Sequence, residues 1–338
     1  MTTLADEIVS NDNLLSLREA IAASAAGDTI DFAPGLVGTL TLTSGELSIG
    51  RNMTITGPIN GRLIVSGNNA SRVFNISGGT VNISNLTTSN GRAAGANGVN
   101  GNLAPGFPGG DMQGGGIFNS GTLTLMNCTL NGNAATGGSG NGGGIFNQGT
   151  LHLINCTLSG NSAAGGPGGF VVAFPAQGGT GGNGYGGALF NQGTLTLTHC
   201  TFSSNSVTSG NGGTGNPFGD HGSGNGGGLY NSAGSIPIGS SIIAGNSAVS
   251  ASPDVAGAFI SSGYNLIGKT DGSSGFVNGV NLNSDLGQRY RIEHKDALAA
   301  AAWTTVEDNL VGTGMMMQVP DMGAGTLPKR FYRGLVLP

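Results

Sequence analysis

Short runs in which apolar and polar residues alternate recur through the centre of the chain. In the run Thr122–Met126, leucines at positions 123 and 125 alternate with threonines at positions 122 and 124. Alternation with a period of two is typical of half-buried β-strands. A helix is excluded because glycine or asparagine interrupts every run. The pattern therefore predicts many short strands joined by turns.

These runs belong to an internal repeat. Units that begin with glycines start at Gly114, Gly142, Gly186 and Gly226, the first reading GGGIFNSGTLTLMNCTLNGNAA, and a degenerate copy starts at Arg72. One unit cannot bury its apolar face alone, so the units must stack. Strands that repeat in the same direction stack in parallel, about 4.8 Å apart. The sequence therefore predicts an all-β fold, a right-handed parallel β-helix.

Stacking brings equivalent positions of successive units into columns. We expect an inner cysteine column, an aromatic column, and an asparagine column whose side-chain amides bond between turns. Three cysteines spaced 28 and 44 residues apart fit no metal or disulfide framework, so free buried thiols are expected. The columns are Cys128, Cys156 and Cys200 with Leu86 in the early copy; Phe118, Phe146, Phe190 and Tyr230; and Asn119, Asn147, Asn191 and Asn231.

The two ends of the chain differ from its centre. Residues 13–23 have a helical pattern in which Ser16 and Glu19 are spaced as a capping box, and this helix would cover the first open strand edge. We expect a short N-terminal α-helical cap over residues 1–35, repeats over 36–284, and a small C-terminal β module over 285–338. Strands are predicted at 29–32, 39–43, 47–49, 53–56, 290–293, 303–306, 315–319 and 330–333.

Composition narrows the class of protein further. Glycine contributes 67 residues, but along the chain the glycines keep no three-residue period and only 12 prolines accompany them, which excludes collagen. No lysine or arginine occurs between Ala93 and Gly268, so nucleic acid is not an expected partner. No apolar run reaches membrane-spanning length.

Three insertions leave the repeat at one corner, at Arg92–Gln113, Gly165–Tyr185 and Thr208–Asn225. Loops on one face of a solenoid often form its binding face. The candidate binding residues are aromatic, and the alternative is that their side chains pack back on the coils. They are Phe107, Phe170, Phe174, Tyr185 and Phe218.

The residues do not predict an active site. Glycoside hydrolysis needs two carboxylates facing one groove, and Asp111, Asp220 and Asp254 lie in or beside separate loops. Lyase chemistry with calcium needs an acid cluster and a base, and the central coils carry no lysine or arginine. Three histidines, His152, His199 and His221, have no carboxylate or second histidine beside them in the repeat register and are expected at the solvated surface. We assign no catalytic residue, metal ligand or cofactor.

The N-terminal segment resembles a known family. Its runs LSLREAI from Leu15 and GDTIDF from Gly27 resemble the CSLREA segment of secreted bacterial β-helix repeat proteins, with Leu15 in place of the usual first cysteine. The repeats resemble polymorphic-outer-membrane-protein-like and pectin-lyase-like β-helices, and residues 253–268 resemble their closing coil. The resemblance covers about residues 4 to 280. The pattern YRIE…W…RFYR at the C-terminus is similar to modules attached to secreted bacterial repeat proteins.

The resemblance implies a secreted or cell-surface protein, although the first residues lack the basic and apolar run of a secretion signal. We expect a monomeric, non-catalytic scaffold for adhesion or for matrix or carbohydrate interaction, with a C-terminal module that sorts, anchors or caps. The alternative is a polysaccharide lyase or hydrolase. A third candidate is a flat threonine face that binds ice or crystalline carbohydrate, built on Thr122, Thr150 and Thr194.

Overall fold

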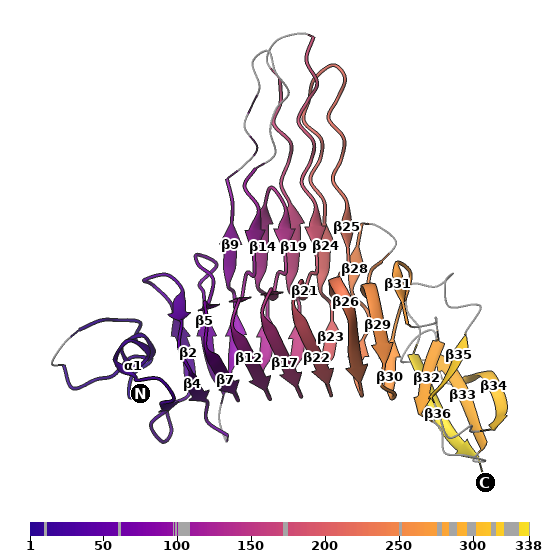
Figure 1. Cartoon of the computed structure of the whole chain (residues 1–338), viewed down its shortest axis with the longest axis horizontal. Helices are drawn as coiled ribbons and strands as arrows, with labels where there is room; N and C mark the ends of the chain where they lie inside the picture. The colour runs from indigo at the N-terminus through magenta and orange to yellow at the C-terminus, as the bar shows by residue number, and fades with distance from the viewer. Residues whose placement is uncertain are drawn as a thin grey trace.

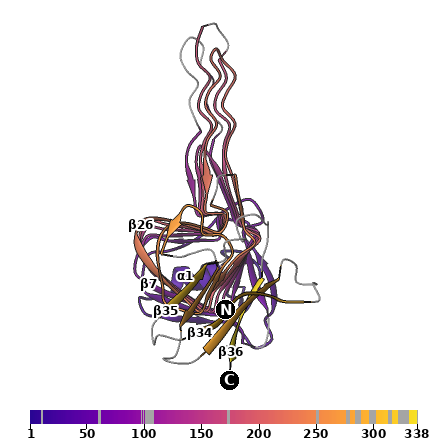
Figure 2. The same cartoon turned by 90° about the vertical axis from the view of Figure 1, so that its right-hand side faces the viewer.

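The protein is a solenoid of stacked parallel β-sheets (Figures 1 and 2). Strands contain 46% of its residues and helix 3%, which confirms the all-β prediction. This computed structural model describes residues 1–9, 12–59, 62–96, 98, 100, 109–171, 175–249, 252–275, 279–283, 289–295, 302–311, 316–320 and 331–337.

The central turns each contribute five strands. The turn that starts at Ile117 contains β11 (Ile117–Asn119), β12 (Thr122–Met126), β13 (Thr129–Asn131), β14 (Ala134–Gly137) and β15 (Gly140–Asn141). The next two turns repeat this order. They contain β16 (Ile145–Asn147), β17 (Thr150–Ile154), β18 (Thr157–Ser159), β19 (Ser162–Gly165) and β20 (Gly184–Tyr185), followed by β21 (Leu189–Asn191), β22 (Thr194–Thr198), β23 (Thr201–Ser203), β24 (Ser206–Thr208) and β25 (Gly224–Asn225).

The earlier turns are less regular, and the last ones lose the five-strand order. Before the centre come β1 (Thr29–Asp31), β2 (Gly38–Thr41), β3 (Leu47–Ile49), β4 (Met53–Thr56), β5 (Leu63–Ser66), β6 (Phe74–Ile76), β7 (Thr80–Ser84), β8 (Thr87–Ser89), β9 (Arg92–Ala94) and β10 (Met112–Gln113). After it come β26 (Leu229–Gly239), β27 (Ile242–Ile243), β28 (Ser247–Ala248), β29 (Val255–Ser261), β30 (Asn265–Ile267) and β31 (Ser273–Ser274).

Successive turns stack in register, as the repeat predicts. Thr122 pairs with Thr150, which pairs with Thr194, and the leucines beside them pair in the same order. Leucine, isoleucine and cysteine side chains from the 14-stranded and 10-stranded sheets and the segments between them fill the interior. The three thiols are free and buried, and each donates to a carbonyl oxygen of the preceding turn, for example Cys156 Sγ to Leu125 O at 3.4 Å. Burial raises the pKa of the Cys200 thiol.

A buried asparagine column runs along the turns as predicted. The Nδ2 of Asn119 donates to Asn147 Oδ1 at 2.7 Å, Asn147 donates to Asn191 at 2.7 Å, and Asn191 donates to Asn231 at 2.9 Å. All four side chains are buried. Because buried amides without partners are costly, this chain of bonds fixes each turn on the next.

A second buried asparagine column was not predicted. It consists of Asn133, Asn161, Asn205 and Asn246, each of which donates both its backbone N–H and its Nδ2 to the Oδ1 of the next member, at 2.8–3.1 Å. The last member, Asn246, donates to Asp254 Oδ1 in the same way. The backbone N–H and one Nδ2 hydrogen of each asparagine therefore point along the column toward Asp254, while Nδ2 also donates to a backbone carbonyl of the preceding turn.

The N-terminal end is covered by helix α1 (Leu17–Ala23). The predicted capping box is confirmed, since the Ser16 hydroxyl accepts from Glu19 N–H and the Glu19 carboxylate accepts from Ser16 N–H at 2.8 Å. The helix buries Leu17 and Ile21 against the first turn. In Figure 1 it closes the left end of the solenoid.

At the other end the parallel stacking stops. The last parallel strand of one sheet, β30, pairs antiparallel with β32 (Gly279–Asn283), and β32 pairs antiparallel with β35 (Met316–Pro320). A separate antiparallel sheet contains β33 (Arg289–Lys295), β34 (Thr304–Val311) and β36 (Phe331–Leu337). Antiparallel strands thus cover the edge of that sheet, which would otherwise be open to another chain.

Removing one amide from the second column is expected to destabilise the solenoid. In Asn161→Ala the donors of Asn133 lose their acceptor, and Leu130 O loses the 3.0 Å bond from Asn161 Nδ2. These buried groups lose their partners, so the free energy of unfolding should fall by about 2–4 kcal/mol.

Urea denaturation measures this loss. The matched control is Asn131→Ala, because Asn131 is an exposed asparagine of the preceding turn that also bonds to the next turn, at Ser159 Oγ. Its exposed groups rebind water, and we expect a loss below about 1 kcal/mol. Equal losses in the two variants would show that the buried amides do not hold the turns together.

Candidate functional site

The insertions form a narrow projection, here called the glycine tower, that rises from one corner of the solenoid (Figures 1 and 2). The chain leaves the solenoid after β9, β14, β19 and β24 and returns to it at β10, β15, β20 and β25. These strands lie in two parallel sheets at the corner, so stacking of the turns places the hairpins side by side. The prediction that the insertions share one corner is confirmed.

Backbone hydrogen bonds between tower chains advance in steps of three residues. Gly168 N–H donates to Asn211 O and Val171 N–H to Thr214 O, both at 2.9 Å. The same ascending chain of the last hairpin, residues 210–214, also bonds to the descending chain of the inner hairpin: Gly210 N–H donates to Gly182 O at 2.8 Å and Gly213 N–H to Gly179 O at 2.7 Å. Extended chains with three residues per turn have this step. The tower is therefore a laterally bonded bundle of extended chains.

Glycine is required in the tower because the chains approach closely. A Cβ on Gly182 would lie 1.3 Å from Gly138 O, and a Cβ on Gly210 would lie 1.8 Å from Gly166 O. Every third position is free of this contact and carries an exposed side chain, as at Pro167, Gln177, Thr180, Asn211 and Thr214. A local three-residue period thus exists in the tower, although the chain as a whole has none.

The descending chain of the last hairpin has fewer glycines than its ascending chain or either chain of the inner hairpin. The inner hairpin reads GGPGGF on the way up and GGTGGN on the way down, and it contacts chains on both sides. The last hairpin reads GNGGTG and GDHGSG, and its exposed side includes Asn211, Asp220 and His221. Asn211 and Asp220 are equivalent to the exposed Pro167 and Thr180 of the inner hairpin. His221 stands where the inner hairpin has Gly181, a glycine at a chain contact, so its side chain opposes the addition of a further chain.

An aromatic column supports the base of the tower. It is the predicted column of Phe118, Phe146, Phe190 and Tyr230, with ring centroids 5.6, 5.2 and 5.1 Å apart. These rings point away from the solenoid interior, since Ile117 and Asn119, on either side of Phe118, are buried inside. The Arg72 guanidinium lies 5.4 Å from the centroid of Phe118 and closes the column at its N-terminal end.

The candidate residues separate into two groups. Phe170 is 47% exposed and Phe218 is 71% exposed. Phe218 follows the bend at 214–217, and Phe170 precedes Val171, whose N–H bonds to Thr214 O, so both lie away from the solenoid. Tyr185 lies at the base instead, where its ring is 6.0 Å from that of Phe190 and 4.8 Å from that of Tyr230. Phe107 and Phe174 lie outside the described residues. Tyr185 therefore follows the alternative in which an aromatic packs back on the coils.

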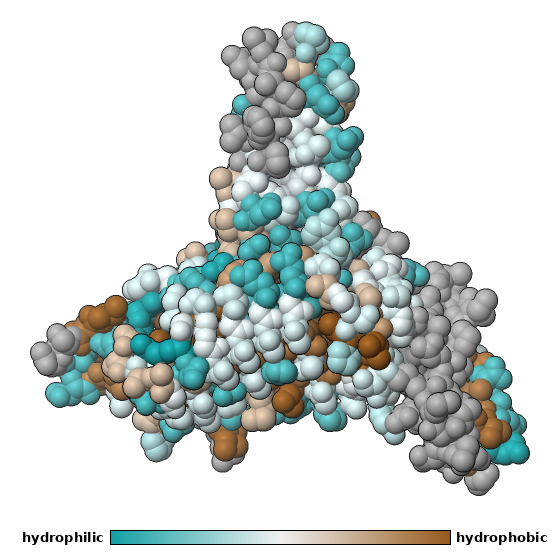
Figure 3. Space-filling view, in the orientation of Figure 1, coloured by the Kyte–Doolittle hydropathy of each residue, from teal (hydrophilic) through white to brown (hydrophobic). Residues whose placement is uncertain are grey.

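The described surface of the tower is otherwise weakly polar. Figure 3 shows it mostly in white and teal, with little of the brown that marks apolar residues. Its described acids are Asp111, whose Oδ1 accepts from Ser139 N–H at 2.7 Å, and Asp220. The exposed rings of Phe170 and Phe218 are thus the distinctive groups on a nearly uncharged rod.

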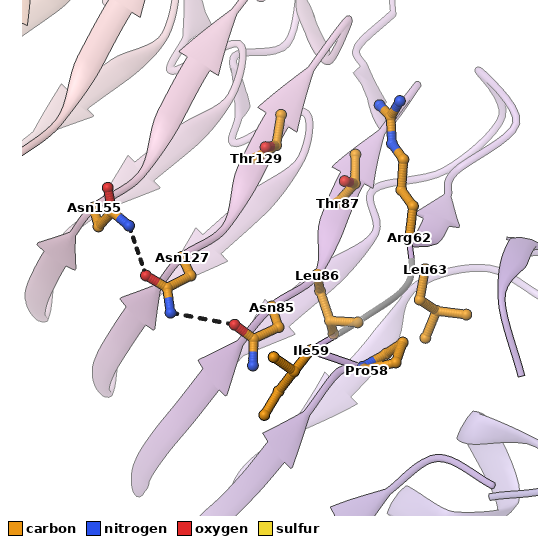
Figure 4. A pocket seen from close by; sticks show the side chains of 10 residues that line it. All are labelled: Pro58, Ile59, Arg62, Leu63, Asn85, Leu86, Thr87, Asn127, Thr129 and Asn155. Carbon is orange, nitrogen blue, oxygen red and sulfur yellow. Dashed lines mark hydrogen bonds between the residues drawn. The ribbon is translucent and has the colours of Figure 1, made fainter. Parts of the chain in front are cut away.

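A groove of about 560 Å³ lies on the solenoid at the corner between two sheets (Figure 4). Its floor carries Asn85, Asn127 and Asn155, which occupy left-handed corners (φ 52–56°) and bond to one another at 3.2 and 2.8 Å. Arg62 and Ile59, from the connection between β4 and β5, form one wall. No carboxylate lines this groove, so it lacks the acid pair that glycoside hydrolysis requires.

His152 and the threonine row lie on regular strands of the solenoid. His152 Nδ1 lies 2.7 Å from Thr196 Oγ1, and the predicted threonine row at 122, 150 and 194 is in register. Within the described part of the chain, no three histidine, cysteine or acidic side chains are placed to hold a metal ion. None of the described helices is long and apolar enough to span a membrane.

No protein-family model, curated protein or solved structure matches this chain.

Two features of the structure were not predicted from the sequence, although each has a signal in it. The second asparagine column could have been found from Asn133, Asn161 and Asn205, which each lie three residues after an apolar residue of the repeat, Leu130, Leu158 and Phe202. The three-residue step of the tower is visible in GGPGGF and GGTGGN, but only when these insertions are read separately from the strands.

Adding one methyl group inside the tower is expected to loosen it. In Gly182→Ala the new Cβ would overlap the backbone of Gly138, which cannot move as a side chain would. Overpacking of this kind costs at least about 1–3 kcal/mol of local stability. Hydrogen exchange of tower amides should accelerate by tenfold or more on this scale, while the amides of β12 and β17 stay protected.

The control is Thr180→Ala, two residues before Gly182 in the same descending chain. Thr180 is exposed, so its truncation should leave exchange of the tower unchanged. Similar exchange in Gly182→Ala and the parent protein would show that the tower chains do not pack this closely.

Proposed function

We propose that this protein is a non-catalytic scaffold, secreted or displayed at a cell surface, that presents the glycine tower to a binding partner. The observation that carries the proposal is the tower itself, a bonded bundle whose far end exposes Phe218 and Phe170. Single apolar side chains are common on surfaces, but here two phenylalanines stand out on a rod of glycine and small polar residues.

The proposal includes a right-handed β-helix. Connections between parallel strands of one sheet are right-handed in nearly all proteins, because the right-handed twist of strands favours that crossover. The parallel pairings between successive turns, such as β12 with β17, place this chain under the same rule. The resemblance of the N-terminal segment and repeats to secreted bacterial β-helix proteins supports the same architecture and an extracellular location.

The form of the tower suits adhesion. Chains bonded along their length lose little further conformational entropy when the far end binds a partner, which favours affinity. The interval from Ala93 to Gly268 has no cation and three acids, so polyanions such as nucleic acid are poor partners. Neutral carbohydrate and other uncharged components of a cell surface or matrix fit the phenylalanines and the neighbouring hydroxyl and amide groups.

The enzyme alternative is less well supported. The groove in Figure 4 has a guanidinium and amides but no carboxylate, and the buried carboxylate of Asp254 belongs to an asparagine column. Turnover of neutral or acidic polysaccharides, assayed with and without calcium, tests this alternative directly. Turnover that survives purification would replace the scaffold proposal with a lyase or hydrolase.

Removing the exposed ring of Phe218 is expected to weaken binding to a glycan or surface-component array by at least tenfold, since an exposed aromatic anchor contributes about 1.5 kcal/mol or more. The variant is Phe218→Ser, compared with the parent protein on every component that the parent binds. Thermal unfolding should be unchanged, because this ring is 71% exposed.

The matched control is Tyr264→Ser, which removes an aromatic ring that is 66% exposed on the solenoid, outside the tower. It should bind as the parent does. If Phe218→Ser retains full binding, or if both variants lose it equally, the partner does not bind the end of the tower.

A further inference from the structure

Asp254 is a buried carboxylate in an unusual position, at the end of the second asparagine column. Its residue is 3% exposed. Its Oδ1 accepts from Asn246 N–H at 2.9 Å and from Asn246 Nδ2 at 2.8 Å, and its Oδ2 accepts from Lys269 N–H at 2.8 Å. One carboxyl group thus joins the end of the column to the next turn.

The turn that Asp254 holds is the closing segment, residues 262–275, which contains β30 and β31. This segment is where parallel stacking ends, and β30 forms the antiparallel pair with β32 that leads into the C-terminal strands. Space around the carboxyl is tight, since a Cβ on Gly268 would lie 2.5 Å from Asp254 Oδ2. The closing segment therefore cannot move away without exposing Asp254 to water.

The surroundings of Asp254 oppose its charge more than they support it. None of the three ion pairs found among the described residues involves Asp254. Burial raises the pKa of Asp254 to about 6, and the hydrogen bonds from Asn246 and Lys269, together with the Lys269 charge, act in the opposite direction but do not cancel it. Asn246 and Gly268, which lie against the carboxyl group, carry no charge, and its charged neighbour is Lys269, whose backbone N–H bonds to Oδ2.

We propose that Asp254 makes the packing of the closing segment against the solenoid depend on pH. This segment and the C-terminal strands attached to it are held more tightly in mild acid than at neutral pH. The pH dependence arises because a buried carboxyl group must ionise inside the protein. This proposal does not depend on what the tower binds.

The direction follows from proton linkage. When the closing segment opens, Asp254 meets water and its pKa returns toward the ordinary value of 3.8. Between about pH 4 and pH 6 the closed state holds a proton that the open state has lost, so acid favours the closed state. As pH rises through about 6 the closed state must bury a carboxylate, and opening becomes easier. With these two pKa values, the opening equilibrium should increase about tenfold between about pH 5 and about pH 7.5.

Hydrogen exchange followed by mass spectrometry tests the proposal on the full chain. The variant Asp254→Asn keeps an acceptor for Asn246, loses the acceptor of Lys269 N–H equally at every pH and carries no charge, so position 254 no longer titrates. At each pH the exchange of peptides from residues 262–275 is compared between variant and parent, which cancels the intrinsic pH dependence of exchange. The ratio of parent to variant rates is expected to rise about tenfold from about pH 5 to about pH 7.5.

Asp271→Asn is the matched control, because Asp271 is an exposed acid of the same segment. Its ratio to the parent should stay constant with pH. A constant ratio for Asp254→Asn would overturn the proposal, as would a parent that becomes better protected at neutral pH. Should Asp254→Asn not fold, carbon-13 NMR of aspartate-labelled parent protein decides: a carboxyl titrating near 6 supports the proposal, and the absence of any aspartate titrating above about 5 overturns it.

Discussion

The structure depends on hydrogen bonds between identical side chains in neighbouring turns. Asn119 and its equivalents, and Asn133 and its equivalents, form continuous buried chains of amides. Such a bond forms only when the next turn presents an asparagine at the same position. A shift by one residue would leave the amides without partners and turn the inward leucines outward. The polar columns therefore determine the register, while the leucine and cysteine columns provide most of the buried apolar area.

The tower extends the same constraint beyond the solenoid. Because the turns are in register, insertions at one corner emerge side by side, and glycine lets their backbones bond directly. The two regions solve the packing problem differently: the solenoid alternates its side chains with a period of two, and the tower uses a period of three with glycine at the contacts. The aromatic column from Phe118 to Tyr230 joins them, since it lies on the solenoid and beneath the tower.

Much of the solenoid was predictable because its signals repeat. The strands at Thr122 and Thr150, the cysteine column, the Asn119 column and the Ser16 capping box follow from spacing and local chemistry, and the structure confirms them. The candidate site was less predictable. Whether an aromatic such as Tyr185 or Phe218 is buried depends on contacts between loops that do not repeat. The role of Asp254 was missed because its partners, Asn246 and Lys269, belong to turns that depart from the repeat.

The central claim is that equivalent residues of successive units touch. Nitroxide labels on Met126→Cys and Thr198→Cys measure this directly, because these exposed positions belong to one column two turns apart, with Ile154 between them. The native thiols are buried and do not compete for the label. Two strand spacings place the labelled positions about 10 Å apart, so strong dipolar broadening of the electron paramagnetic resonance spectrum is expected. A spectrum equal to the sum of the two single-label spectra would contradict the account.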